Sequence, residues 1–469
     1  MGRPELVIVS NRGPLSFRLG PDGEPVPRRG GGGLVSSLGP AVAGTGALWV
    51  AGALSDADRV AAARGVVEAE GFRLHPLVVE PAAYRQYYDT IANGTLWFLH
   101  HGLFDLPRRP RIDRRWHEAW AAFRDVNRAF AEVVAGEAGE GATVLVHDYH
   151  LPLVAPALAD LRPDLETVYF HHTPFCGPTS LRVLPEPAAA ELLGGMGASS
   201  ACGFHSARWA RAFEACAVEV LGAPPPTFVA PAAVDAADLG AAVASPECDR
   251  HLAELEGQVG DRRLVVRVDR IELSKNILRG FLAFEALLEA EPAWREQVVF
   301  AASLYPSRDS LPEYLAYRNE VEALAARIND TWSTPSWNPI LLDAADSFPA
   351  SLAALRRYDV LLVNPVRDGL NLVALEGPCV NQRDGVLVLS REAGACEVVG
   401  DSALAVNPYD VAGTADALGR ALAMGAGERA ARAAGLRAAA GRRTPVDWLG
   451  DQLAAVSDRA RSPGEPRGG

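Results

Sequence analysis

The chain has 469 residues, 49% of them hydrophobic and 22% charged, a composition typical of a folded globular protein with two or three domains. Its 45 basic and 58 acidic residues give a net charge of −13, which argues against a nucleic-acid-binding protein with a basic face. The six cysteines are scattered and no apolar stretch approaches about 18 residues, so we expect a cytoplasmic protein without disulfides, signal peptide or membrane span.

The N-terminal region begins with a short apolar run, Leu6 to Val9, that predicts a buried strand. A hairpin-like excursion follows, and then four successive glycines at residues 30–33, with Arg12 and two further arginines nearby. Glycines let a backbone approach a ligand closely, and arginines bind phosphate. The glycine spacing does not match a dinucleotide-binding fingerprint. We expect a phosphate or sugar site here, with a flexible linker as the alternative.

Further strands are predicted at residues 47–50, 95–99, 143–147 and 167–170, and Tyr88 and Trp97 belong to an aromatic cluster of a kind more often found in a core. Asp148 and His172 each follow a predicted strand. Four histidines near these strand ends could suggest a metal site. They lack a helical His-x-x-x-His pair and accompanying thiolates, so we expect no metal.

In the second half, several predicted strands again end in charged residues. Arg270 and Lys275 follow the strand that begins near residue 262, Arg308 follows residues 298–303, and Asp368 follows residues 360–363. A helix is expected from Leu370 onward, and it would carry Glu376. Ligands of open α/β sheets bind at the carboxyl ends of the strands, and a helix N-terminus favours a diphosphate. The alternative is a set of solvated cations and acids in surface turns.

The alternation of strands and helices in both halves predicts an α/β protein with two facing Rossmann-like domains and the active site in the cleft between them. We expect an N-terminal domain at residues 1–240, a polar linker at 241–260 and a second domain at 261–440. Residues 441–469 are expected to form a helix that packs back on the first domain, followed by a disordered tail from residue 462.

Six motifs, taken in order, resemble the trehalose-6-phosphate synthase family, retaining glycosyltransferases of family 20 with the GT-B fold. They are Val-Ser-Asn-Arg at 9–12, Gly-Gly-Leu ending at 34, Val-His-Asp-Tyr-His at 146–150, Asp-Arg-x-x-x-Ser-Lys at 269–275, Arg-Asp-Gly-x-Asn-Leu-Val-Ala at 367–374 and Asn-Pro-Tyr-Asp at 407–410. The resemblance covers about residues 5 to 425. It implies transfer of glucose from a nucleoside diphosphate glucose to glucose 6-phosphate, giving α,α-trehalose 6-phosphate, without a metal or other cofactor. We also expect a homo-oligomer.

The resemblance implies an acceptor site built from five residues. Arg12 and Arg308 would bind the phosphate of glucose 6-phosphate, and Tyr88 and Trp97 would line that site. Asp148 would hold acceptor hydroxyls near the reacting centre.

It also implies a donor site. His172 would hydrogen-bond the donor hexose and Asp368 would hold its hydroxyls. Arg270 and Lys275 would neutralise the leaving diphosphate, and Glu376 would bind the ribose. The remaining donor residues would be Gly33, Asn371 and Leu372. Catalytic roles are expected for Asp148, His172, Arg270, Lys275 and Asp368.

Several positions depart from the usual family pattern. The usual Asp-Tyr-Ser-Lys-Gly is Glu272-Leu-Ser-Lys-Asn276 here, and the segment 342–347 carries Asp343 and Asp346 in place of aromatic residues. These acids and the segment 381–384 resemble a related cyclitol-coupling branch that uses GDP donors. Guanine offers an N1–H and an amino group to a carboxylate, whereas uracil offers one N–H. We therefore favour GDP-glucose over UDP-glucose.

Three other functions are alternatives to this transferase, and the sequence argues against two of them. One is a pseudo-glycosyltransferase that couples a GDP-activated cyclitol to an amino-cyclitol phosphate. A nicotinamide oxidoreductase would need the missing dinucleotide glycine spacing. A non-catalytic sensor of nucleotide sugars would be expected to lose one of Arg270, Lys275, Asp368 or Glu376, and all four are present.

Overall fold

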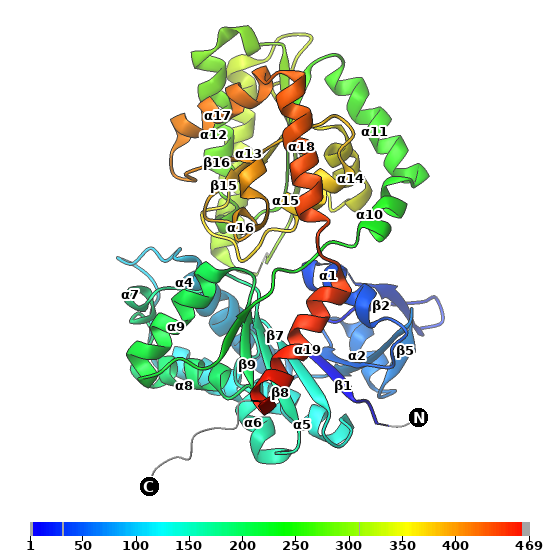
Figure 1. Ribbon diagram of the computed structural model, residues 1–469, viewed down its shortest axis with the longest axis vertical. Helices are drawn as coiled ribbons and strands as arrows, with labels where there is room; N and C mark the ends of the chain where they lie inside the picture. The colour runs from blue at the N-terminus through cyan, green and yellow to red at the C-terminus, as the bar shows by residue number, and fades with distance from the viewer. Residues whose placement is uncertain (1–2, 31, 309, 462–469) are drawn as a thin grey trace. The chain divides into compact units, whose positions relative to one another are not determined.

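The computed structural model describes residues 3–30, 32–308 and 310–461, and the chain divides into two units (Figure 1). Unit 1 comprises Met1–Ala232 and Pro445–Gly469, and unit 2 comprises Ala233–Thr444. Gly31 of the glycine run and the predicted disordered tail, residues 462–469, lie outside the described residues.

Unit 1 is built on an eight-stranded sheet with the strand order β10-β9-β8-β7-β1-β4-β6-β5. Neighbouring strands run parallel, except that β5 pairs with β6 antiparallel. The central strands are continuous apolar runs, as expected where a parallel sheet is buried on both faces. The strands are β1 (Leu6–Ser10), β4 (Leu48–Gly52), β5 (Val67–Ala69), β6 (Phe72–Leu77), β7 (Thr143–His147), β8 (Glu166–His171), β9 (Ala201–Phe204) and β10 (Thr227–Val229).

A separate antiparallel hairpin, β2 (Leu15–Leu19) and β3 (Pro25–Arg29), forms the predicted excursion after β1. The helical segments of unit 1 are α1 (Gly33–Val42), α2 (Asp56–Ala62), α3 (Pro81–Arg85), η1 (Gln86–Trp97), α4 (Phe98–His101), α5 (Arg114–Glu137), α6 (Val154–Leu161), α7 (Pro178–Leu181), α8 (Glu186–Gly197), α9 (Ala207–Leu221) and α19 (Pro445–Arg461).

The strand predicted at residues 95–99 is wrong, because this segment is helical. A helix begins at Pro81, where the Glu80 side chain accepts the N–H of Ala83, and it continues through the π-helical η1 into α4. Its buried side packs on α5, and the indole N–H of Trp116 donates to the Thr95 hydroxyl at 3.1 Å. A short apolar run fits a buried strand or a buried helix equally well.

Unit 2 is built on a six-stranded parallel sheet with the order β13-β12-β11-β14-β15-β16. Its strands are β11 (Arg263–Arg270), β12 (Val298–Tyr305), β13 (Ile340–Asp343), β14 (Val360–Val363), β15 (Val386–Ser390) and β16 (Leu404–Val406). The helical segments are α10 (Ala236–Val243), α11 (Pro246–Val259), η2 (Leu273–Lys275), α12 (Ile277–Ala290), η3 (Pro292–Trp294), α13 (Pro312–Trp332), α14 (Phe348–Arg357), α15 (Val373–Val380), α16 (Cys396–Val399), η4 (Gly400–Ser402), α17 (Val411–Ala423) and α18 (Ala426–Ala440).

The linker predicted at residues 241–260 is also wrong, since α10 ends and α11 lies within it. The Ser245 hydroxyl caps α11 by accepting the N–H of Cys248, and Pro246 occupies the first turn. The helix packs on α14, where the guanidinium of Arg356 meets the Asp249 carboxylate at 2.7 Å. A polar, acidic composition therefore reflects a solvated helix face rather than a break between domains.

None of the helices in the described residues is long and apolar enough to cross a membrane. All six cysteines are thiols, and four of them are buried.

The last helix, α19, packs on α1 and on the sheet of unit 1 beside β8 (Figure 1). Its Trp448 is fully buried and donates its indole N–H to the carbonyl of Ala230 at 3.1 Å. The indole meets the ring of Phe170 on β8 edge to face, with 5.2 Å between ring centroids. The C-terminal segment is thus held on unit 1 by one large aromatic side chain.

We expect Trp448→Ala to destabilise unit 1 by about 3–5 kcal/mol, because it removes a fully buried indole and its hydrogen bond. The matched control is Val446→Ala on the same helix, where the side chain is 65% exposed and the change should stay within about 0.5 kcal/mol. Urea unfolding of both variants measures the difference. Equal effects would contradict this role for Trp448.

Candidate functional site

The carboxyl edge of the unit 1 sheet carries three of the predicted site residues. Arg12 lies two residues beyond β1 with its side chain exposed, Asp148 directly follows β7, and His172 directly follows β8. Asp148 has a φ of 76°, a left-handed conformation that is uncommon and strained for a residue with a side chain. Its Oδ1 accepts the backbone N–H groups of Tyr149 at 3.0 Å and His172 at 3.4 Å. The two strand ends are therefore joined through this carboxylate.

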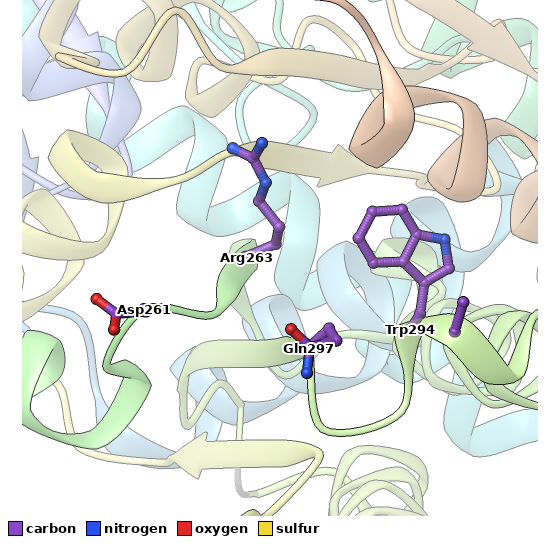
Figure 2. A pocket seen from close by; sticks show the side chains of 5 residues that line it. Asp261, Arg263, Trp294 and Gln297 are labelled. Carbon is purple, nitrogen blue, oxygen red and sulfur yellow. The ribbon is translucent and has the colours of Figure 1, made fainter.

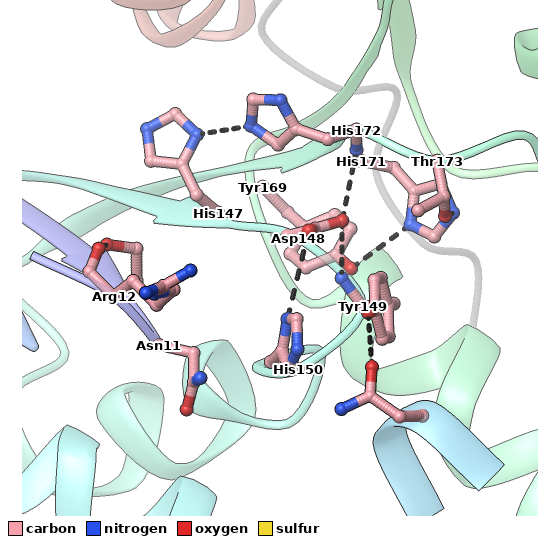
Figure 3. A network of polar contacts seen from close by, with 12 residues as sticks. Asn11, Arg12, His147, Asp148, Tyr149, His150, Tyr169, His171, His172 and Thr173 are labelled. Carbon is pink, nitrogen blue, oxygen red and sulfur yellow. Dashed lines mark hydrogen bonds and ion pairs between the residues drawn. The ribbon is translucent and has the colours of Figure 1, made fainter. Parts of the chain in front are cut away.

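His172 lies in the middle of a chain of three imidazoles, part of which Figure 3 shows. The N–H of Ala232 donates to Nδ1 of His205, so the proton of His205 is on Nε2 and points to Nδ1 of His172, 3.1 Å away. His172 then donates from Nε2 to Nδ1 of His147 at 3.0 Å. Burial holds the pKa values of His147 and His172 far below the usual range, so both rings are neutral.

These hydrogen bonds between imidazoles restrict the predicted role of His172 as a ligand of the donor hexose. Both of its ring nitrogens are engaged within unit 1, so a hydrogen bond to a donor hexose requires the bond to His147 to open. His147 was grouped with His150, His171 and His172 from the sequence but was given no role, and His205 was not part of that group. The one feature of the sequence that could have indicated a role for His147 and His205 is that each lies at the end of a predicted strand. Among the described residues, no group of three His, Cys, Asp or Glu side chains is arranged to hold a metal ion.

The two predicted aromatic site residues differ in exposure. Tyr88 is partly exposed and stacks on His150, with ring centroids 5.6 Å apart, and His150 lies 3.8 Å from the Asp148 carboxylate. Trp97 is only 2% exposed and stacks on His101 at 4.2 Å. The structure therefore groups Tyr88 with Asp148, whereas Trp97 is part of the core.

Gly33 is the first residue of α1, and the preceding Gly32 has a φ of 119°, which favours glycine. The glycine run thus leads directly into a helix N-terminus, where backbone N–H groups are available to an anion. A linker, the alternative from the sequence, does not describe this turn.

In unit 2, Arg270 is the last residue of β11, and Lys275 ends the short turn η2 that follows. The Lys275 ammonium lies 2.6 Å from Oδ2 of Asp368, beyond the end of the neighbouring strand β14. Burial by itself would lower the pKa of Lys275, but Asp368, Asp269 and Glu272 raise it. Lys275 is therefore a fixed, fully charged cation next to the predicted hexose-binding carboxylate.

The backbone around Asp368 is tightly held. Its N–H donates to the carbonyl of Glu392, and its carbonyl accepts the N–H of Gly394. A Cβ on Gly394 would collide with the carbonyl of Gly369, so only glycine fits there. Asn371, with a φ of 75°, donates from its amide to Oδ2 of Asp368 at 3.1 Å.

Because the left-handed backbone of Asn371 is not helical, α15 begins at Val373 and not at the predicted Leu370. Leu372 is the N-cap residue of this helix. The predicted residues Asn371 and Leu372 thus form the turn between Asp368 and the first turn of α15.

Glu376 lies in the first turns of α15 and is partly buried. Burial raises the pKa of its carboxyl group to about 7. A carboxyl group with this pKa is poised between its neutral and ionised forms at neutral pH, a feature often found at ligand sites.

Arg308 follows β12, with a φ of 51°, and its guanidinium contacts the Glu272 carboxylate at 3.0 Å. Arg270 contacts the same carboxylate, also at 3.0 Å. From the sequence, Glu272 was only a departure from the family pattern and not a predicted site residue. Its position two residues after Arg270, in a turn at a strand end, was the feature of the sequence that could have indicated a contact with Arg270.

The segment 381–384, part of the basis for favouring a guanine donor, lies before β15 and hence at the amino end of the sheet. Asn381 is buried and binds the carbonyls of Leu355 and Tyr358, and Asp384 pairs with Arg437 at 3.1 Å. These side chains stabilise packing within unit 2, so their contacts give no support to a guanine donor.

A pocket of about 330 Å³ opens at the same amino edge, lined by Asp261, Arg263, Ala293, Trp294 and Gln297 (Figure 2). Arg263 begins β11 and Arg270 ends it. With a rise of about 3.3 Å per residue, roughly 23 Å separates this pocket from the charged residues at the carboxyl edge. The pocket is therefore distinct from the predicted site.

The predicted site residues fall into one set in each unit. Arg12, Gly33, Tyr88, Trp97, Asp148 and His172 belong to unit 1, and Arg270, Lys275, Arg308, Asp368, Asn371, Leu372 and Glu376 belong to unit 2. In unit 1, the set consists of hydrogen-bonding groups, the carboxylate of Asp148, whose backbone is left-handed, and one cation, Arg12. In unit 2, three cations share two carboxylates, an arrangement suited to binding phosphate groups.

Comparisons with known proteins identify the family of this chain. The profile of Glycosyltransferase family 20 matches residues 4–458. The chain is 34% identical over 451 residues to "Alpha,alpha-trehalose-phosphate synthase [UDP-forming] 1" of Arabidopsis thaliana, covering 92% of this chain and 47% of that relative. It is 32% identical over 448 residues to "Trehalose-6-phosphate synthase" of Mycolicibacterium vanbaalenii, covering 90% and 89% of the two chains. The chain spans about half the length of the Arabidopsis relatives it matches.

Solved structures extend the similarity to the fold. An alpha,alpha-trehalose-phosphate synthase (UDP-forming) from Burkholderia vietnamiensis aligns with a TM-score of 0.84 and 31% identity, covering 97% of this chain and 99% of that one. The E. coli protein bound with UDP-2-fluoro glucose aligns with a TM-score of 0.83 and 27% identity, covering 98% and 100%. The two units are the two Rossmann-like domains of the GT-B fold. From its motifs, its two parallel sheets and these matches, the chain belongs to glycosyltransferase family 20, the trehalose-6-phosphate synthase family.

Proposed function

We propose that this chain transfers glucose from a nucleoside diphosphate glucose to glucose 6-phosphate with retention of anomeric configuration, giving α,α-trehalose 6-phosphate. The observation that carries the proposal is the cluster of Arg270, Lys275 and Asp368 at the carboxyl ends of β11 and β14. It offers two cations for a diphosphate and one carboxylate for sugar hydroxyls. Further support comes from related chains solved with UDP-2-fluoro glucose and with glucose 6-phosphate.

In the proposed reaction, the bond between the anomeric carbon and the diphosphate oxygen breaks, and a bond to the hydroxyl of the acceptor forms on the same face. The acceptor proton passes to the leaving phosphate. Arg270 and Lys275 stabilise the charge that develops on this phosphate, and Asp368 orients the hexose. Asp148 and Arg308 orient the acceptor, so the protein contributes mainly positioning and charge stabilisation.

The direct test is a product assay with glucose 6-phosphate and either UDP-glucose or GDP-glucose. We expect trehalose 6-phosphate with retained configuration from at least one donor. Absence of product from both donors would reject the proposal and favour the cyclitol-coupling alternative.

We expect Arg270→Ala to lower kcat by about 10²-fold to 10³-fold with a smaller change in KM for glucose 6-phosphate, because Arg270 acts on the leaving group. Steady-state kinetics with saturating donor measures this split. The control is Arg250→Ala, which removes an exposed cation on α11. An unchanged kcat in Arg270→Ala would contradict the assignment.

We expect donor binding to weaken below neutral pH. A ribose hydroxyl donates to an ionised carboxylate, and the pKa of Glu376 is raised to about 7, so its carboxylate form is lost as the pH falls through 7. The Kd of the donor should rise about tenfold from pH 8 to pH 6. Calorimetry with the intact nucleotide sugar measures this, because its diphosphate does not titrate in that range.

The control for this pH dependence is Glu376→Gln, whose donor Kd should be nearly independent of pH. A wild-type Kd that is the same at pH 6 and pH 8 would count against Glu376 as a ribose ligand.

The donor base is tested separately. The names of the Arabidopsis and Burkholderia relatives specify UDP. The remaining support for guanine is Asp343, at the carboxyl end of β13, and Asp346, both exposed. If these carboxylates bind guanine, Asp343→Asn and Asp346→Asn should lower kcat/KM for GDP-glucose about tenfold and leave UDP-glucose unaffected. Asp330→Asn, an exposed acid on α13, is the control. Equal effects on both donors would exclude this basis for guanine selection.

A further inference from the structure

A single buried carboxylate oxygen in unit 2 holds two arginines. Oε1 of Glu272 lies 3.0 Å from a guanidinium nitrogen of Arg270 and 3.0 Å from Nη1 of Arg308. The hydroxyl of Ser307 donates to the same oxygen at 3.0 Å. Glu272 is 2% exposed, whereas the side chain of Arg270 is 51% exposed and that of Arg308 is 10% exposed.

The backbone brings these groups together. Strands β11 and β12 pair in parallel with Arg270 opposite Tyr305, and the N–H of Ile271 donates to the carbonyl of Tyr305. The turn after β11 thus runs beside the end of β12, and Glu272 faces the segment that carries Arg308. Nη1 of Arg308 also donates to the hydroxyl of Tyr314 at 2.6 Å, and this second hydrogen bond helps to fix the position of the Arg308 guanidinium.

The local charge is unbalanced in favour of cations. Burial alone would raise the pKa of Glu272, but Arg270, Arg308 and Lys275 lower it to about 2, so the carboxylate is ionised at neutral pH. The two arginines and Glu272 together carry a net charge of +1. A buried carboxylate shared in this way fixes the direction of both guanidinium groups while leaving positive charge for incoming anions.

We infer that Glu272 is a positioning residue that ties the arginine for the leaving diphosphate to the arginine for the acceptor phosphate. This inference rests on the proposed function, in which Arg270 and Arg308 bind phosphates of different substrates. Glu272 competes with substrate phosphates for both guanidinium groups, so it lowers the affinity for each anion and raises the fraction of complexes with correct geometry. The family pattern has an aspartate here, and this chain has the longer glutamate.

The experiment compares Glu272→Gln with Glu272→Asp. Glu272→Gln keeps the shape and removes the charge, so we expect KM for glucose 6-phosphate and Kd for the nucleoside diphosphate to fall by about threefold to tenfold. Its kcat should fall at least about tenfold, because the arginines lose their fixed orientation. Glu272→Asp keeps the charge, so it should retain wild-type anion affinities and recover part of kcat.

Single-turnover rates must fall in parallel with kcat in Glu272→Gln, which distinguishes lost positioning from slow release of a tightly bound product. Thermal unfolding establishes that both variants are folded. If Glu272→Gln does not fold, the test rests on Glu272→Asp. A higher KM for glucose 6-phosphate or a higher Kd for the nucleoside diphosphate in that variant would overturn the inference. Weaker anion binding together with lower kcat, or no change in either, also overturns it.

Arg270→Ala and Arg308→Ala separate this inference from the proposed function. Weaker binding of nucleoside diphosphate in the first variant and of glucose 6-phosphate in the second supports the assumed roles. If both roles hold but Glu272→Gln leaves affinity and kcat unchanged, only the inference fails. If neither arginine variant changes binding, the proposed function and the inference fail together.

Discussion

The parallel pairing of β11 with β12 on one side and β14 on the other brings the predicted site residues of unit 2 together. Parallel strands end at the same edge of a sheet, so residues that follow them meet although they are far apart in the sequence. Arg270 is the last residue of β11, and Arg308 and Asp368 follow β12 and β14. Most residues of these strands are buried and apolar, apart from the buried ion pair of Arg267 and Asp269 in β11, so the accessible polar side chains lie at the strand ends.

Electrostatic pairing explains how this edge stays ordered. Cations with restricted exposure to water need partners, since an unpaired buried charge is costly. Lys275 is paired with Asp368, and Arg270 and Arg308 share Glu272. These ion pairs fix the direction in which the cations point. A phosphate group would then meet side chains whose orientation is already set, which is the condition for efficient stabilisation of developing charge.

Unit 1 uses a different physical principle. Its strand ends carry neutral imidazoles, whose protonation is suppressed by burial, and one carboxylate held at a strained backbone position, Asp148. Directional hydrogen bonds of this type distinguish hydroxyl groups but do little to neutralise phosphate. Arg12, which follows β1, adds an exposed cation to these groups. The predicted site residues of unit 1 therefore combine directional hydrogen bonds with one cation, whereas those of unit 2 include three cations paired with two carboxylates.

The α/β class, most of the strands and the polar residues that follow them could be predicted from the sequence, because continuous apolar runs and strand-end residues are local features of the chain. Other features depend on contacts between distant segments. Residues 95–99 became helical through packing on α5, and residues 246–259 became a helix anchored on α14. The roles of Glu272 and Trp448 depend on partners from other strands and helices. Such partners are chosen by burial and pairing between distant segments, which no local pattern encodes.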